Sequence, residues 1–261
     1  MTSNNQRFDS IPFFDYCKTA FENLFTGAKS ISEIEFANSL IPEFRPYDIK
    51  TFDANVFAIS QYKQYFEIHG IQSQFNAGIA LACYSHISES SGLWEIVSNM
   101  LSVKNGFRYN FYPFAELVKK FGDKNNAVSP NANRVLRSIL KYCMESNAFD
   151  LVNIFQQGFD ADVRNGFAHA DYVIQPEGIY LGLRYKKGRF INWEEFGMIF
   201  SKGMAVYDAL TEIHSESLQS YSTPREIIKP EPDKNGSDHI RIELINGNFS
   251  ISQMFVPNEN D

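Results

Sequence analysis

Cysteine is scarce in this chain, and its spacing excludes two kinds of cross-linked fold. Cys17, Cys83 and Cys143 lie far apart among 261 residues. An odd number without paired spacing argues against a disulfide framework and against a zinc motif. All three fall within apolar helical patterns, so the sequence predicts buried thiols.

Long apolar runs and an excess of positive charge are also missing. The first residues are polar and no stretch reaches the length of a membrane span, so we expect a cytoplasmic protein with no membrane partner. The net charge is −7 and the isoelectric point is about 5.3. This acidity argues against an extended, non-specific nucleic-acid binder, but it is compatible with an enzyme that has a local basic site.

Several familiar catalytic motifs do not occur. The sequence contains no phosphate-binding loop, dinucleotide fingerprint, zinc-protease helix or serine nucleophile elbow. We therefore expect no cofactor and no metal centre. His86 and Glu89 are three apart on one face of a predicted helix, but two ligands do not make a metal site. The alternative is that this pair contacts and orients a motif elsewhere in the chain.

Helical periodicity is the main pattern that the chain does contain. Hydrophobic residues make up 44%, including 24 Phe and 13 Tyr, which is enough for a substantial core. Ser129-Pro130 is typical of a helix start, and Asn192 of a helix cap. Apolar residues recur at helical spacing over residues 11–26, 53–68, 72–100 (with an interruption at Gly92), 113–121, 130–143, 149–165 and 193–218. The predicted fold is mainly α, a helical bundle.

Two regions depart from the helical pattern. Short β-like runs separated by turn residues predict a small β insertion over residues 172–191. Asn246-Gly247 between two alternating runs predicts a C-terminal β-hairpin over residues 239–257. We expect residues 1–70 to be a helical extension packed on the bundle, 71–221 to be the bundle with its insertion, and 222–238 to be a linker.

The strongest functional signal is the run Arg164-Asn165-Gly166-Phe167-Ala168-His169. Metal-free RNA cleavage needs a base for the ribose 2′-hydroxyl, which His169 can supply. It also needs a fixed cation for the charge that grows on the phosphate, which Arg164 can supply, with Asn165 to position phosphate or base. The structural alternatives are an Arg164 ion pair with Asp160 or Asp162, and an Asn165 that only ends a helix.

The backbone at Gly166 decides how these side chains meet. In a continuous helix, residues five apart lie about 140° apart around the axis, so Arg164 and His169 would diverge. Asn165 and His169, four apart, would share a face, and a second copy of the chain could complete the site. If Gly166 instead ends the helix in the left-handed conformation, His169 can fold back toward Arg164.

The arginine, polar residue and histidine at these positions resemble the motif of the HEPN family (higher eukaryote and prokaryote nucleotide-binding domains). At the level of helix order the resemblance covers residues 72–220. It implies a HEPN-like helical bundle with Arg164, Asn165 and His169 as catalytic residues, and a homodimer in which the motifs face each other. The implied activity is a metal-independent endoribonuclease, as in toxins and defence effectors, that leaves 2′,3′-cyclic phosphate and 5′-hydroxyl ends. An antitoxin or regulatory protein would then be a partner. The alternative is a non-catalytic module that binds nucleotide or RNA or mediates dimerisation.

A basic run follows the motif and is the predicted RNA-binding segment. It contains Arg184, Lys186, Lys187 and Arg189; a solvated hairpin turn is the alternative. Tyr172 is a further substrate-binding candidate, although it is better suited to begin a strand than to act as a catalytic group. In the toxin branch of the family a tyrosine often follows the histidine at the second position, where this chain has Asp171.

Overall fold

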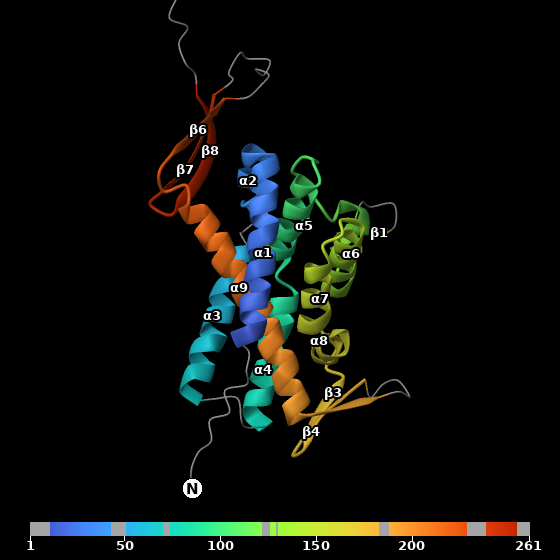
Figure 1. The fold of residues 1–261 in the computed structure, drawn as a ribbon. Coiled ribbons are helices and arrows are strands. Elements are labelled where there is room, and N and C mark those ends of the chain that lie inside the picture. The colour runs from blue at the N-terminus through green and yellow to red at the C-terminus, as the bar shows by residue number, and fades with distance from the viewer. Residues whose placement is uncertain are drawn as a thin grey trace, which may run out of the picture.

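The structure is a computed structural model that describes residues 11–42, 51–69, 74–121, 126–128, 130–182, 188–228 and 239–254. The predicted mainly helical class is confirmed (Figure 1). The helices are α1 (Ile11–Ile31), α2 (Glu33–Ser39), α3 (Thr51–His69), α4 (Gln74–Ser88), α5 (Ser91–Lys104), α6 (Ala132–Glu145), α7 (Phe149–Gly158), α8 (Ala161–Ala168) and α9 (Trp193–Gln219), with a 3-10 turn at Ala115–Leu117. The strands are β1 (Lys119–Phe121), β2 (Asn126–Val128), β3 (Tyr172–Gln175), β4 (Gly178–Leu181), β5 (Arg189–Asn192), β6 (Arg225–Ile228), β7 (His239–Ile245) and β8 (Asn248–Met254).

Helix α1 lies in the middle of the bundle, between α5, α7 and α9 (Figure 1). The ring of Phe21 on α1 packs edge-on against Phe155 on α7, and Trp94 on α5 packs on the same ring. One hydrophobic core joins buried residues from Cys17 to Ile242. Helix α1, which lies in the predicted extension 1–70, therefore shares one core with the helices of the predicted bundle.

Several expected helices end elsewhere than the pattern indicated. The run over 72–100 is interrupted at Glu89 and Ser90 rather than at Gly92, which lies in the first turn of α5. Residues 113–121 form no α-helix: Ala115–Leu117 is a 3-10 turn, and Lys119–Phe121 is β1, which pairs with β2. Helix α6 is capped by Asn131, whose Oδ1 accepts a hydrogen bond from the Arg134 N–H at 3.0 Å, whereas Ser129 lies outside the described residues.

The helix expected over residues 149–165 is two helices, because α7 ends at Gly158 and α8 begins at Ala161. The buried Tyr84 on α4 bridges the break: its Oη accepts from the Asp160 N–H at 2.6 Å and donates to the Gly158 carbonyl at 3.0 Å. The Asp160 carboxylate then caps α8 by accepting from the N–H groups of Asp162 and Val163. These bonds make α8 a separate short helix, and α8 carries the motif.

The predicted β insertion is confirmed. Strands β3, β4 and β5 form an antiparallel sheet at the end of the bundle where α9 begins (Figure 1). Its inner face is buried through Ile179, Leu181 and Ile191. Asn192 then caps α9 as predicted, accepting from the Glu195 N–H at 2.8 Å.

The C-terminal hairpin is also confirmed, and it has a third strand. Asn246 and Gly247 both have positive φ, 52° and 79°, as a tight hairpin turn between β7 and β8 requires. Strand β6 pairs with β7, so residues 225–228 of the predicted linker are a strand, and residues 229–238 of it lie outside the described residues. This sheet lies at the opposite end of the bundle from β3-β4-β5 (Figure 1). Within the described ranges, no helix combines the length and apolarity needed to cross a bilayer.

Candidate functional site

The motif lies on α8, and the helix continues through it. His169 is the C-terminal cap, and its N–H donates to the Asn165 carbonyl at 3.0 Å. Gly166 therefore does not end the helix. Ala170 does, with a φ of 49°, and the Asp171 N–H closes the end on the Gly166 carbonyl at 2.8 Å. Of the two backbone alternatives, the continuous helix is correct.

Gly166 has a packing role instead of a conformational one. A Cβ at this position would lie 2.7 Å from Cδ2 of Leu181 on β4. A real Cβ does not approach a neighbour so closely, so a larger residue here would displace the buried Leu181 side chain. The sheet thus lies against the C-terminal half of the motif helix.

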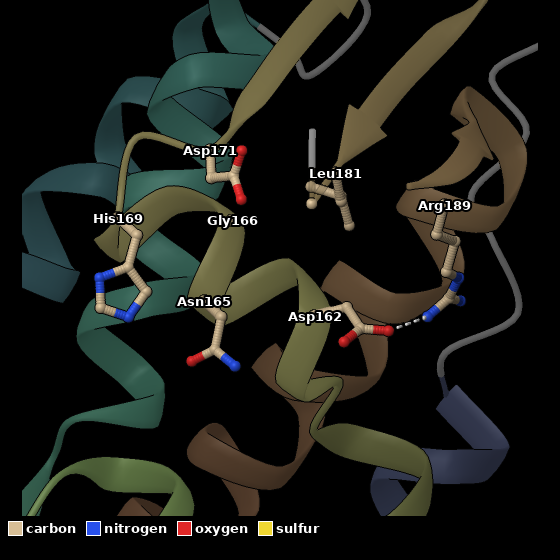
Figure 2. A pocket seen from close by; sticks show the side chains of 8 residues that line it. Asp162, Asn165, Gly166, His169, Asp171, Leu181 and Arg189 are labelled. Atoms are coloured by element: carbon tan, nitrogen blue, oxygen red, sulfur yellow. Dashed lines mark ion pairs between the residues drawn. The ribbon is translucent and has the colours of Figure 1, made fainter. Parts of the chain in front are cut away.

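A pocket of about 320 Å³ opens between α8 and this sheet. Asn165 and His169 both line it, as the continuous helix predicts for residues four apart. The other lining residues are Asp162, Gly166, Asp171, Leu181, Gly182 and Arg189. Figure 2 shows the His169 ring and the Asn165 amide beside each other, with Asp162 and Arg189 on the other side. His169 is exposed and Asn165 half-buried, so ligand can reach both.

Arg164 points to the other side of α8 and is only 8% exposed. It lines two smaller pockets, of about 210 and 240 Å³; the first also holds Ser91 and Ala132, the first residues of α5 and α6. Its Nη2 donates to the Glu89 carboxylate, and its Nε is buried without a hydrogen-bond partner. Of the pair His86 and Glu89, Glu89 contacts the motif as the sequence-based alternative expected, whereas the His86 ring packs against Tyr62.

Asn165 connects the two sides of the helix. Its Oδ1 accepts from Arg164 Nη1 at 3.1 Å and from Nδ2 of Asn133 on α6 at 2.8 Å. An amide oxygen has two lone pairs, and these two donors use both. The amide orientation is thus fixed, and Nδ2 is the atom that remains for a ligand in the pocket. Asn165 stands inside α8, so the interpretation that it merely ends a helix is wrong.

Arg189 on β5 makes the ion pairs that the structural alternative assigned to Arg164. Its Nη1 donates to Asp160 and its Nη2 to Glu195, each at 2.7 Å, while Asp162 lies 3.6 Å away. The carboxylates of Glu195 and Asp160 raise the pKa of Arg189 above its ordinary value, against the opposite effect of burial. Because three acidic groups offset its charge, Arg189 mainly joins β5 to α8 and α9.

Of the other predicted substrate-binding residues, the structure describes only Tyr172, which does not line the pocket. Lys186 and Lys187 lie outside the described residues. Tyr172 begins β3, and its half-buried ring stacks on Phe167 of α8 at a centroid distance of 6.0 Å. The structure thus places Tyr172 in the packing between α8 and the sheet.

Other reactive groups do not gather into a second centre in the described part of the chain. Cys17, Cys83 and Cys143 are buried, and burial raises the pKa of each thiol to about 12. Among the described residues, no three His, Cys, Asp or Glu side chains are grouped so that they could hold a metal ion.

Comparison of the chain with protein-family models, curated proteins and solved structures finds no match.

Proposed function

We propose that the protein is a metal-independent endoribonuclease of the HEPN type, a cytoplasmic toxin or defence effector that cuts RNA to 2′,3′-cyclic phosphate and 5′-hydroxyl ends. One observation carries the proposal. His169 and Asn165 lie on one face of α8 and line the same pocket, where Arg164 and Asn133 hold the Asn165 amide in a single orientation. An accessible imidazole beside a fixed amide donor suits acid–base chemistry on a phosphodiester.

In the proposed reaction His169 accepts the proton of the ribose 2′-hydroxyl. The 2′-oxygen attacks the adjacent phosphorus, the bond to the 5′-oxygen breaks, and that oxygen takes up a proton. Asn165 Nδ2 donates to a non-bridging oxygen as negative charge grows there. Arg164 holds the orientation of the amide, so in a single chain it acts on the phosphate through Asn165.

The reaction also supports a homodimer. One chain supplies one histidine, whereas cleavage benefits from a base and an acid on opposite sides of the phosphate. Two copies of α8 facing each other across a two-fold axis supply both, and closed two-fold dimers are the commonest oligomers. An antitoxin or regulatory protein that covers this face would switch the activity off.

A second candidate function is a non-catalytic module that binds nucleotide or RNA or holds a dimer together. The observation that favours it is the burial of Arg164, whose guanidinium is committed to Glu89 and Asn165 rather than open to a phosphate.

Labelled RNA incubated in EDTA distinguishes these functions. We expect the wild type to cleave, and His169→Ala to lose at least about 10²-fold, the range for a general acid–base group. His69→Ala is the matched control, since His69 is an exposed histidine on α3. Cleavage that stops in EDTA and returns with a divalent ion would contradict the proposed mechanism. Full activity of His169→Ala would favour the non-catalytic module.

A further inference from the structure

The outer face of the β3-β4-β5 sheet carries a row of apolar side chains. Val173, Tyr180 and Phe190 are direct cross-strand neighbours and are 43%, 38% and 40% exposed. The Tyr180 and Phe190 ring centroids lie 4.8 Å apart, with 45° between the ring planes. A water-facing sheet surface normally carries polar residues, so adjacent exposed rings at these positions point to a contact surface.

The fold holds these rings in place. A Cβ on Gly178, the neighbour in the same sheet, would lie 2.9 Å from Cζ of Phe190 and 2.1 Å from the Ile191 carbonyl oxygen. The Phe190 ring therefore extends over backbone that only glycine leaves open. The opposite face of the strands is buried in the core, so little conformational freedom remains to be lost when a ligand binds.

The size of the surface suits nucleobases better than a protein. Two aromatic rings exposed to this degree offer roughly 150 Å², scaled from the 150–250 Å² that a whole ring can bury. A stable protein interface buries about 800 Å² on each partner. Single-stranded nucleic acid needs only ring faces, because each stacked base contributes about 1–3 kcal/mol. Gln175 and Asn192 are exposed in the next row of the same face, where the Gln175 amide and the Asn192 Nδ2 can meet base edges while Asn192 Oδ1 caps α9.

The rings are also close to the candidate cleavage pocket along the chain. Leu181 and Arg189, which line that pocket, are the immediate sequence neighbours of Tyr180 and Phe190. Successive strand residues face opposite sides of a sheet, so the rings and the pocket use opposite faces of β4 and β5. By sequence, the connection between these strands also contains Arg184, Lys186 and Lys187, which favours a polyanion over a neutral peptide.

We propose that Tyr180 and Phe190 form a stacking platform for unpaired bases of single-stranded RNA, which would bind nucleotides that flank the cleaved bond. The platform deepens the proposed nuclease function and rests on it for the identity of the substrate.

Binding of an uncleavable RNA tests the platform. A 2′-O-methyl oligonucleotide containing 2-aminopurine is titrated with the full-length protein, and stacking is followed by quenching of the 2-aminopurine fluorescence. We expect Tyr180→Leu and Phe190→Leu each to weaken binding roughly 5- to 150-fold, the equivalent of losing one stacked base. Phe190→Tyr keeps the ring and should bind as the wild type does. Phe149→Leu is the control, because Phe149 is a 64% exposed phenylalanine on α7.

The possible outcomes separate the platform from the nuclease. The platform is wrong if the wild type does not bind, or if both leucine variants bind as tightly as Phe149→Leu. If the leucine variants bind RNA as the wild type does but sediment with a different mass, this face is an interface between copies of the chain. Weakened binding by the leucine variants supports the platform even if the wild type does not cleave RNA, a result that would refute only the nuclease.

Discussion

Arg164 is a buried cation that shares a pocket with the N-terminal residues of two helices. Its pocket includes the first residues of α5 and α6, and the N-terminal amides of a helix carry partial positive charge. Glu89 provides the compensating negative charge, and Asn165 accepts the second hydrogen bond. The ion pair therefore determines both where the guanidinium lies and how the Asn165 amide is turned.

We expect Glu89→Gln to lower RNA cleavage by about 10- to 10²-fold, because a small displacement of a positioning group has effects of this size. The loss should be in kcat, since Glu89 acts through Arg164 and Asn165. Glu177→Gln, an exposed glutamate in the turn between β3 and β4, is the control. The measurement is steady-state cleavage with a thermal melt of each variant. Wild-type kcat for Glu89→Gln would show that the ion pair only stabilises the fold.

At this scale the sequence identified the candidate residues but not all of their contacts. The spacing of Asn165 and His169 predicted their shared face. It could not predict that Asn133, 32 residues away, would fix the amide, because that contact depends on how α6 and α8 pack. Nor could the sequence show which arginine would form an ion pair with Asp160, since Arg189 reaches this carboxylate from a neighbouring strand.

Helix α8 is defined by contacts at both of its ends. Its start depends on the Tyr84 hydroxyl, 76 residues from Asp160, and this long-range bond is why periodicity alone predicted one helix over residues 149–165. Its end depends on Ala170 in a conformation that favours glycine. Local patterns therefore predicted helical structure in this segment, while contacts with distant side chains set where α8 begins and ends.

Two substitutions at this helix end should have opposite effects on stability. Gly166→Ala should lower the free energy of unfolding by about 1–3 kcal/mol, because the new methyl group overlaps Leu181. Ala170→Gly should raise it by about 0.5–1 kcal/mol, since glycine adopts positive φ without steric cost. Urea unfolding measures both changes, provided that the slope of the unfolding free energy against urea concentration is the same as in the wild type. A Gly166→Ala variant as stable as the wild type would show that β4 does not pack this closely on α8.

The whole molecule separates its two three-stranded sheets, with α9 running between the ends of the bundle (Figure 1). The motif and the aromatic row belong to the β3-β4-β5 end, whereas the C-terminal sheet lies at the other end. The sequence predicted both β regions from their turn residues. It did not predict that α1 would be central, because the pairing of helices depends on which apolar faces fit together.

The proposed dimer can be tested with a single introduced thiol. The three native cysteines are buried, so Ala168→Cys, next to His169 on the surface, supplies the accessible thiol. We expect sedimentation at twice the chain mass of 29.9 kDa and an oxidative cross-link between the two copies. Ser222→Cys, exposed beyond the other end of α9, should not cross-link. A monomer, or a dimer that cross-links only through residue 222, would contradict the facing motifs.

The central claim is that His169 activates a ribose 2′-hydroxyl without a metal ion. Mass spectrometry of the cut ends tests it most directly, using an RNA oligonucleotide and its copy with one 2′-deoxy nucleotide at the mapped cut site, both in EDTA. The account predicts 2′,3′-cyclic phosphate and 5′-hydroxyl ends from the RNA, and no cleavage at the deoxy position. Cleavage of the deoxy copy at that position, or products with 5′-phosphate ends, would contradict it.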